Sequence, residues 1–152
     1  MNWDDTFIEI AHKIAQHSTC CKQQVGAIIV KNKRILSTGY NGVVSRAVHC
    51  IDFKNIYSDW ETEQHHNWSI QNELHAEQNC IAYAAREGII IKDASIYVTL
   101  SPCIDCAKLI VASGIIRVIY SGLNRQEKID DGIKFFKEYQ KINPQFQILH
   151  LS

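Results

Sequence analysis

The sequence predicts an α/β fold in which a mixed β-sheet lies between layers of helices. The first observation is the order of the segments, because helical and β-rich patterns follow one another as α-β-β-α-β-α-β-α-β. The second is the length of 152 residues, which fits a single domain over residues 1–152 with one core. The third is the lack of any repeat, linker or low-complexity stretch in the sequence.

The N-terminal part of the chain predicts a helix followed by a β-hairpin. Residues 3–17 carry apolar side chains at helical spacing, which gives this segment one apolar face. Residues 26–30 form a β-rich run, residues 31–33 a polar break, and residues 34–40 a second β-rich run. Two short strands joined by a tight polar turn are typical of a hairpin.

A turn motif and a long polar segment follow the hairpin. Gly39-Tyr40-Asn41-Gly42 is a turn signal at the end of the second strand. Residues 43–72 show weak periodicity, so we expect a long loop there, which holds His49, Cys50, His65, His66 and Trp68. A loop of this length in a compact domain is usually functional or fixed by other contacts, and a bound metal would fix this one.

The rest of the chain predicts helices and strands in turn. One helix is expected over residues 76–87, where Gly88 ends it, and another from Pro102 to the residue before Gly114. A shorter amphipathic helix is expected at 130–139. The three remaining strands are expected at 95–99, 115–120 and 146–149.

Three potential metal ligands stand at the starts of the two central helices. Cys103 and Cys106 are three residues apart, so both sulfurs share one helix face, and the helix N-terminus favours their thiolate form. His75 immediately precedes the other helix. Two thiolates and one imidazole leave a tetrahedral zinc with one open position, which is the pattern of a catalytic site that holds water.

Glu77 follows His75 by two residues. Positions i and i+2 diverge on a helix, so Glu77 is poorly placed to share a metal with His75 and better placed to exchange protons with an activated water. The alternative is a structural zinc knuckle, with Glu77 only a surface charge. The joint pattern of His-x-Glu and Pro-Cys-x-x-Cys favours the catalytic interpretation, because it is the signature of zinc-dependent nucleobase deaminases.

Composition and charge limit the partners and the compartment that we expect. Sixteen Lys and Arg balance sixteen Asp and Glu, so the zero net charge gives no indication of a polyanion-binding surface. Residues 1–5 lack the basic and apolar regions of a signal peptide, and no apolar run reaches the ~20 residues that span a membrane. We therefore expect a cytoplasmic protein without a polynucleotide or membrane partner. In that compartment, six cysteines favour metal binding over disulfides.

The whole chain resembles the deoxycytidylate (dCMP) deaminases, in particular the short phage type. The matching motifs are Cys20-Cys21-Lys22, Val25-Gly26-Ala27-Ile28-Ile29, Thr38-Gly39-Tyr40-Asn41-Gly42, Trp68-Ser69, Asn72-Glu73-Leu74-His75-Ala76-Glu77 and Val98-Thr99-Leu100-Ser101-Pro102-Cys103. The resemblance implies a cytidine-deaminase-like three-layer α/β/α fold with a five-stranded mixed sheet. It also implies a homohexamer that converts dCMP to dUMP and ammonia and so feeds thymidylate synthesis, in the host cytoplasm if the protein is phage-encoded.

The resemblance also implies a role for individual residues. Glu77 is expected to move protons from the zinc-activated water to N3 of the base and to the leaving ammonia. The residues expected to bind the catalytic zinc are His75, Cys103 and Cys106. The expected substrate contacts are a sugar hydroxyl at Asn41, the pyrimidine edge at the backbone of Ala76, and Ser101 beside it. The residues expected to bind a second, structural zinc are Cys20, Cys50, His65 and Glu73.

One substrate-binding position departs from the family pattern. Members often carry an aromatic residue near the 5′-phosphate of the substrate, and alignment from Tyr120 places Asn124 there. An amide does not stack as an aromatic ring does, and it leaves more room near the phosphate. We therefore expect that dCTP is a substrate in addition to dCMP.

Regulation between subunits is a further implication of the resemblance. In the family, dCTP with magnesium activates and dTTP with magnesium inhibits. The residues expected at the effector site are Gly39, Tyr40, Gly42 and Arg86. Glycines in such a turn let backbone N–H groups approach phosphates closely, while Asn41 on the same turn faces the substrate sugar.

Three alternatives remain at this stage. A nucleoside cytidine deaminase would use a Cys-Ala-Glu zinc motif or lack the metal-rich segment. A tRNA adenosine deaminase shares both zinc motifs but would need a basic face, because phosphate contacts dominate RNA affinity. A zinc-stabilised binding module without turnover would have no use for Glu77.

Overall fold

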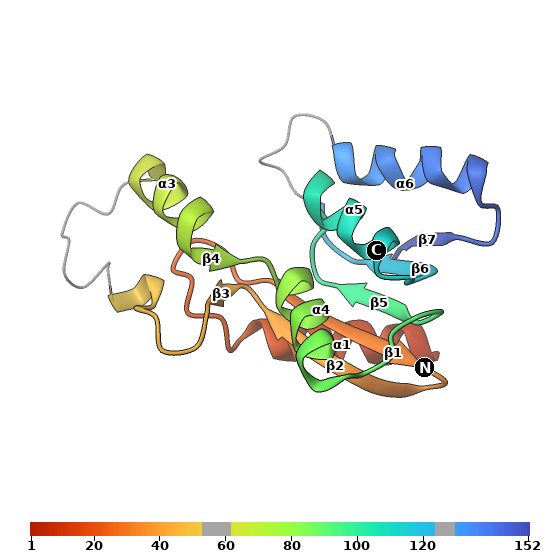
Figure 1. Ribbon diagram of the computed structural model, residues 1–152, viewed down its shortest axis with the longest axis horizontal. Helices are drawn as coiled ribbons and strands as arrows, with labels where there is room; N and C mark the ends of the chain where they lie inside the picture. The colour runs from red at the N-terminus through yellow and green to blue at the C-terminus, as the bar shows by residue number, and fades with distance from the viewer. Residues whose placement is uncertain (53–61, 124–129) are drawn as a thin grey trace.

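A five-stranded mixed sheet forms the centre of the protein (Figure 1), whose computed structural model describes residues 1–52, 62–123 and 130–152. The strands lie in the order β2-β1-β5-β6-β7. Their bounds are β1 Gly26–Lys31, β2 Arg34–Tyr40, β5 Ser95–Val98, β6 Arg117–Tyr120 and β7 Gln147–His150. Strand β1 is antiparallel to both of its neighbours, whereas β5, β6 and β7 run parallel. The prediction of a mixed sheet of five strands is confirmed.

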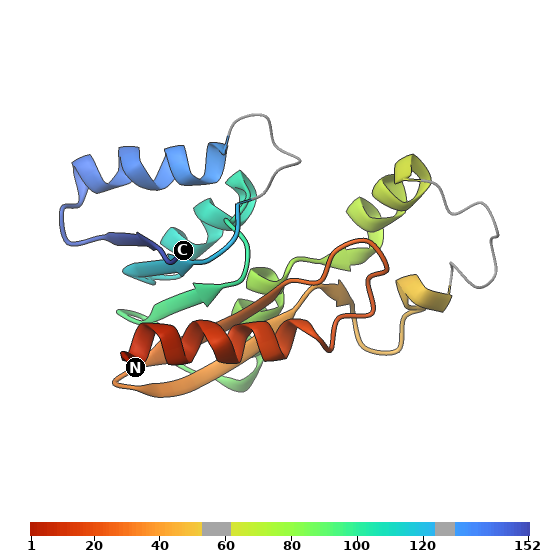
Figure 2. The ribbon, with the colours of Figure 1, turned by 180° about the vertical axis from the view of Figure 1, so that it is seen from behind.

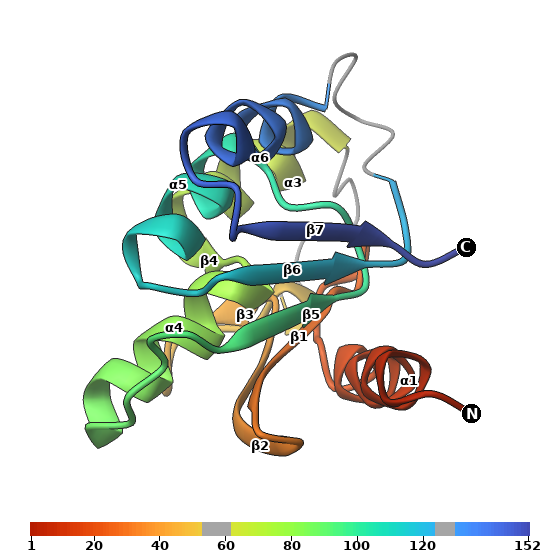
Figure 3. The same ribbon diagram turned by 90° about the vertical axis from the view of Figure 1, so that its right-hand side faces the viewer.

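Helices cover both faces of this sheet, which confirms the predicted three-layer arrangement. Their bounds are α1 Trp3–Ala15, α4 Ala76–Glu87, α5 Ile104–Ala112 and α6 Asp131–Ile142. Helix α1 lies across one face, which Figure 2 shows from behind. Figure 3 shows the other three helices together on the opposite face.

Strand β1 shows why both faces need this cover. Side chains alternate between the two faces of a strand. Ala27 and Ile29 therefore pack into the core under α4, α5 and α6, whereas Ile28 and Val30 pack against α1. All four are buried, and a strand buried on both sides appears in the sequence as a continuous apolar run.

The helix that carries the two central cysteines begins later than the sequence predicts. Pro102 and Cys103 precede α5, and Cys103 occupies its N-cap with extended backbone angles. The Cys103 sulfur accepts a hydrogen bond from the backbone N–H of Cys106 at 3.5 Å. Only Cys106 therefore lies inside the first turn, and Cys103 acts as the capping residue that Ser or Asp provides in other helices.

The described parts of the segment after the hairpin contain regular elements where the sequence predicted a long loop. Strands β3 (Gly42–Val43) and β4 (Glu73–Leu74) form a separate antiparallel pair, and helix α3 (Thr62–Asn72) leads into β4. Residues 50–52 are also helical. Both ribbon views show these parts beyond the ends of the large sheet (Figures 1 and 2).

The prediction of a loop was wrong for α3 because this helix has no apolar stripe. Polar residues from Glu63 to Asn67 occupy successive positions around its first turns.

None of the helices in the described part of the chain has the length and apolar character needed to span a bilayer.

Candidate active site

The N-termini of α4 and α5 bring three metal-binding side chains together. His75 is the N-cap of α4, Cys103 is the N-cap of α5, and Cys106 lies in the first turn of α5. The Nδ1 atom of His75 lies 3.3 Å from the sulfur of Cys106 and 3.5 Å from that of Cys103. The sequence prediction placed these residues at two helix starts, and the structure shows that the two starts converge.

The three donors fit a tetrahedral zinc. With zinc–nitrogen and zinc–sulfur bonds of about 2.1 and 2.3 Å, ligand atoms around a tetrahedral zinc are about 3.6 Å apart. A hydrogen bond from the Cys106 thiol lowers the pKa of Cys103 to about 4, so that this sulfur is a ready thiolate. A hydrogen bond with Cys103 raises the pKa of His75 to about 9. Zinc binding would release the protons that remain on the donors.

Close contact with β2 positions the start of α4. A Cβ built on Gly39 would lie 2.5 Å from the carbonyl oxygen of Ala76, so only glycine lets the strand and the helix backbone approach this closely. The side chain of Asn79 donates a hydrogen bond to the carbonyl oxygen of Tyr40 at 2.7 Å. These contacts fix the helix end from which His75 extends.

Glu77 is buried in the first turn of α4, with 4% of its surface exposed. Burial raises the pKa of its carboxyl group, which favours the protonated form more than water would. A carboxyl group with a raised pKa can both accept and donate a proton during a reaction. Its position beside the three donors fits the proton-transfer role that the sequence predicts.

A pocket of about 760 Å³ opens beside these groups. Its lining includes Glu77, His75 and three of the four predicted substrate-binding residues, namely Asn41, Ala76 and Ser101. The fourth, Asn124, lies outside the described residues. The structure therefore brings the predicted catalytic and substrate-binding residues that it describes to one cavity.

A second group of donors includes three residues that also line this pocket. Its four members have ligand atoms within 4.8 Å of one another and are the predicted ones, Cys20, Cys50, His65 and Glu73. Burial lowers the pKa of His65, which favours the neutral imidazole that binds metals. One oxygen of Glu73 accepts a hydrogen bond from Ser69 at 2.6 Å, and the other is buried without a partner. An unpaired buried oxygen beside two sulfurs and an imidazole is what a metal would satisfy.

All six cysteines of the chain are unpaired, in agreement with the expectation of metal binding rather than disulfides. One thiol near the second cluster was not assigned from the sequence. The Cys21 sulfur lies 3.3 Å from that of Cys50, although Cys21 is not one of the four clustered donors.

The predicted effector residues occupy two separate places in the described chain. Gly39 and Gly42 are buried, and Tyr40 is 41% exposed next to them. Arg86 is exposed in the last turn of α4, where it pairs with Glu87 at 2.9 Å. Arg86 is ten residues beyond Ala76, or about 15 Å along the helix axis. The effector site stays a prediction.

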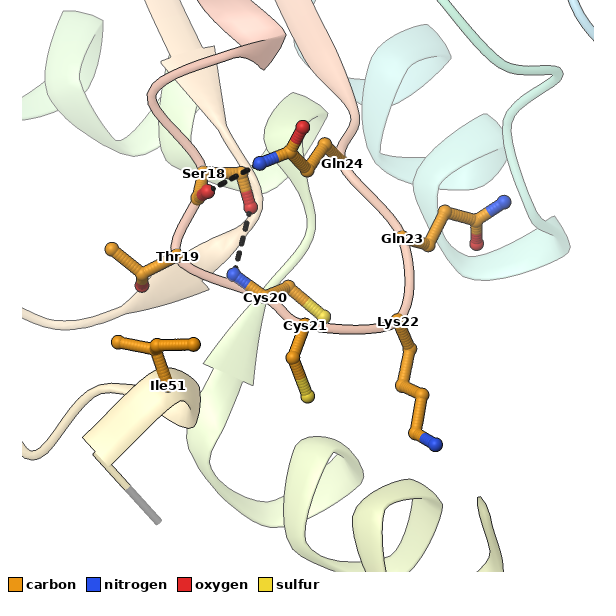
Figure 4. Close-up of a pocket in the computed structure, with 8 residues that line it drawn as sticks. All are labelled: Ser18, Thr19, Cys20, Cys21, Lys22, Gln23, Gln24 and Ile51. Carbon is orange, nitrogen blue, oxygen red and sulfur yellow. Dashed lines mark hydrogen bonds between the residues drawn. The ribbon is translucent and has the colours of Figure 1, made fainter. Parts of the chain in front are cut away.

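Lys22 lines the pocket and was not identified as a functional residue from the sequence. It belongs to the loop between α1 and β1, which Figure 4 shows in close-up. The motif Cys20-Cys21-Lys22 supported the family resemblance, but no periodicity indicates which side chain of an irregular loop faces a cavity.

This combination of fold and donors is shared by the zinc-dependent deaminases of nucleobases, in which a histidine and two cysteines hold the metal beside a glutamate. A sequence profile described as "Cytidine and deoxycytidylate deaminase zinc-binding region" matches residues 1–122. The chain therefore belongs to the cytidine and deoxycytidylate deaminase family and is a deaminase.

Comparison with individual proteins agrees with this family. The deoxycytidylate deaminase of Enterobacteria phage T4 is 39% identical over 145 residues, which cover 76% of this chain and 75% of the phage protein. The ComE operon protein 2 of Bacillus subtilis is 36% identical over 121 residues, covering 80% of this chain and 60% of that protein. The crystal structure of the cyanophage S-TIM5 dCMP deaminase with dCMP and dUMP superimposes with a TM-score of 0.77 at 30% identity, covering 97% and 95% of the two chains.

Proposed function

We propose that this deaminase converts dCMP and water to dUMP and ammonia. The observation that carries the proposal is the buried Glu77 beside the donors His75, Cys103 and Cys106 at the edge of one nucleotide-sized pocket. The names of its phage relatives support the same substrate.

In the proposed reaction, the residues of the chain bind, orient and move protons. His75, Cys103 and Cys106 would hold zinc, which when bound supplies a Lewis acid that activates water for attack on C4 of cytosine. Glu77 takes one proton from the attacking water and delivers it to N3, then takes the second proton from the hydroxyl now bound to C4 and gives it to the amino group, which leaves as ammonia.

Groups from three elements hold the substrate in this proposal. Asn41 contacts a sugar hydroxyl, the backbone of Ala76 contacts the pyrimidine edge, and Ser101 lies beside it. The three residues line the pocket from the end of β2, the start of α4 and the loop before α5. Holding the base and sugar at fixed points keeps C4 at the reacting position, which is a large part of catalysis.

The isosteric variant Glu77→Gln tests the proposed mechanism. It should retain zinc but lose about 10²–10⁴-fold in kcat for dCMP, because an amide cannot shuttle a proton. The exposed Glu138 provides the control, and Glu138→Gln should keep wild-type turnover. Full activity of Glu77→Gln at unchanged zinc content would overturn the mechanism.

We further propose that Cys20, Cys50, His65 and Glu73 bind a second zinc with a structural role. Four protein ligands leave no position for a reacting water. Metal analysis should then find two zinc ions per chain in the wild type and one in Glu73→Gln. A single zinc per chain in carefully prepared wild-type protein would contradict this site.

Substrate range, regulation and assembly complete the proposal. We infer a cytoplasmic homohexamer that also accepts dCTP, is activated by dCTP with magnesium and is inhibited by dTTP with magnesium. The effector site lies between subunits at the turn of Gly39, Tyr40 and Gly42, and Arg86 takes part in the coupling between subunits. Assays should give sigmoidal dCMP saturation that dCTP shifts to lower concentration, along with formation of dUTP. Hyperbolic kinetics from a monomer that ignores both nucleotides would refute the regulation.

A further inference from the structure

A thiol that the proposed function does not use lies against the second cluster of donors. The sulfur of Cys21 is 3.3 Å from the sulfur of Cys50, and the backbone N–H of Cys21 donates a hydrogen bond to the same Cys50 sulfur at 3.4 Å. These two contacts hold the sulfurs side by side. A disulfide bond is about 2.05 Å long, so the sulfurs need to approach each other by about 1.2 Å to form one.

The two thiols differ in their access to solvent. Cys50 is fully buried, with 0% of its surface exposed, whereas Cys21 is partly exposed. Cys21 also lines an open pocket beside the loop between α1 and β1, together with Ile51, as Figure 4 shows. Because oxidation of a thiol follows its exposure, Cys21 is the better placed of the two to meet an oxidant from solvent.

The neighbouring Cys20 is less suited to react with Cys50. Cys20 is itself a donor of the second cluster, and its sulfur lies 3.4 Å from Nε2 of His65. In Figure 4 the sulfurs of Cys20 and Cys21 extend from the loop in different directions. Cys21 is not one of the four clustered donors, so it can react without first leaving a metal.

We propose that Cys21 and Cys50 are an oxidation site, at which a disulfide oxidant joins the two sulfurs and releases the metal of the second cluster. The proposal rests on the proposed second zinc, because Cys50 is one of its four ligands. Disulfides inside cells are usually transient and redox-sensing, which agrees with free thiols in the resting protein.

The step consumes one small disulfide for each bond formed. The Cys21 sulfur bonds to one sulfur of the small disulfide, whose other half leaves as a thiol. The Cys50 sulfur then bonds to the Cys21 sulfur, and the second half leaves as a thiol. The two cysteines lose two electrons and the small disulfide gains them. The Cys21 thiol supplies one proton to the leaving thiols, and solvent supplies the other because the metal had replaced the proton of Cys50.

Loss of this metal would affect the substrate pocket. The three donors that remain, Cys20, His65 and Glu73, also line that pocket. Glu73 lies in β4, two residues before His75. Oxidation at Cys21 therefore couples the redox state of the surroundings to the side chains that shape the pocket.

Treatment of zinc-loaded protein with oxidised glutathione tests the site. Wild-type protein should release one zinc ion per chain to a chromogenic indicator, and peptide mapping should find a disulfide between Cys21 and Cys50. Cys21→Ser keeps all four metal ligands and should retain both ions under the same treatment. The control Cys80→Ala removes a buried thiol of the core and should release zinc as the wild type does.

The outcomes separate failure of this proposal from failure of the second zinc site. Release of the ion from Cys21→Ser at the wild-type rate, or release that coincides with a different cysteine pair, would overturn the role of Cys21. Reduced wild-type protein that holds only one zinc per chain but still forms the disulfide would overturn the second zinc and not the pairing. Wild-type protein with two zinc ions and no disulfide after treatment would overturn the pairing and leave the zinc site and the reaction intact.

Discussion

Replacement of Gly39 by alanine should displace the helix end that carries the catalytic residues. A Cβ at this position would lie 2.5 Å from the carbonyl oxygen of Ala76 and 2.7 Å from the backbone nitrogen of Cys80. Ordinary contact begins at 3.4 Å, so the start of α4 would have to move by about 0.9 Å. Both neighbours are backbone atoms inside a helix, so a change of side-chain rotamer cannot relieve the clash.

Two magnitudes follow from this displacement. Overpacking of a filled interior costs about 1–3 kcal/mol, which for a domain of this size corresponds to a fall of about 2–12 °C in Tm. A misplacement of about 1 Å at a catalytic group can cost about 10²-fold in rate. Gly39→Ala should therefore lower both the melting temperature and kcat for dCMP, while the exposed neighbour on the same strand, Thr38→Ala, should change neither.

The assay pairs thermal unfolding with dCMP turnover and zinc analysis. An unchanged Tm and kcat in Gly39→Ala would refute the close-packing argument. Normal basal turnover with a lost response to dCTP would instead assign Gly39 to the effector site. The variant thus distinguishes the two explanations of this glycine.

Two further substitutions test the fold, and one treatment tests the metal. Arg117 donates hydrogen bonds of 2.8 and 2.7 Å to the two oxygens of Asp4 and holds the pKa of Asp4 below its usual value. Asp4→Asn should cost about 2 kcal/mol at neutral pH. This difference from the wild type should shrink as the pH falls below about 4, because the ion pair is lost when Asp4 is protonated. Urea unfolding of Asp4→Asn and the wild type at several pH values would measure this cost and its pH dependence, with the exposed Glu9→Gln as control. A difference in unfolding free energy that does not change with pH would contradict the ion pair. Phe136→Ala removes a fully buried ring stacked on Phe146 and should cost about 3–5 kcal/mol of unfolding free energy, whereas a cost below about 1 kcal/mol would contradict the packing. Removal of zinc by a chelator should abolish dCMP turnover, and added zinc should restore it. Turnover that survives in demonstrably metal-free protein would rule out the zinc mechanism.

The sequence predicted those features of the structure that depend on residues close together in the chain. The spacing of Cys103 and Cys106 and the place of His75 before a helix follow from local geometry, and their convergence was inferred from the family resemblance. Strand β1 was found because a strand covered on both sides is a continuous apolar run. Helix α3 was missed because its turns around His65 and His66 present polar residues on all sides.

The place of Lys22 in the lining of the pocket could not be predicted because it depends on tertiary structure. Which loop side chain enters a pocket is decided by Asn41, 19 residues further along the chain, which fixes the loop backbone. The approach of Cys21 to Cys50 likewise joins positions that are 29 residues apart. Local propensity contains no information about contacts of this kind.

The pairing of β3 with β4 has a consequence for how this enzyme could diversify. Gly42 lies opposite Leu74 and Val43 opposite Glu73, so the intervening residues leave and re-enter the scaffold at adjacent points. Doubling the length of such a closed loop costs only about 0.6 kcal/mol of chain entropy. Insertions between these two strands that keep Cys50 and His65 would leave His75 anchored in place. The junction therefore offers a graft point at which new recognition elements can be added beside an unchanged reaction centre.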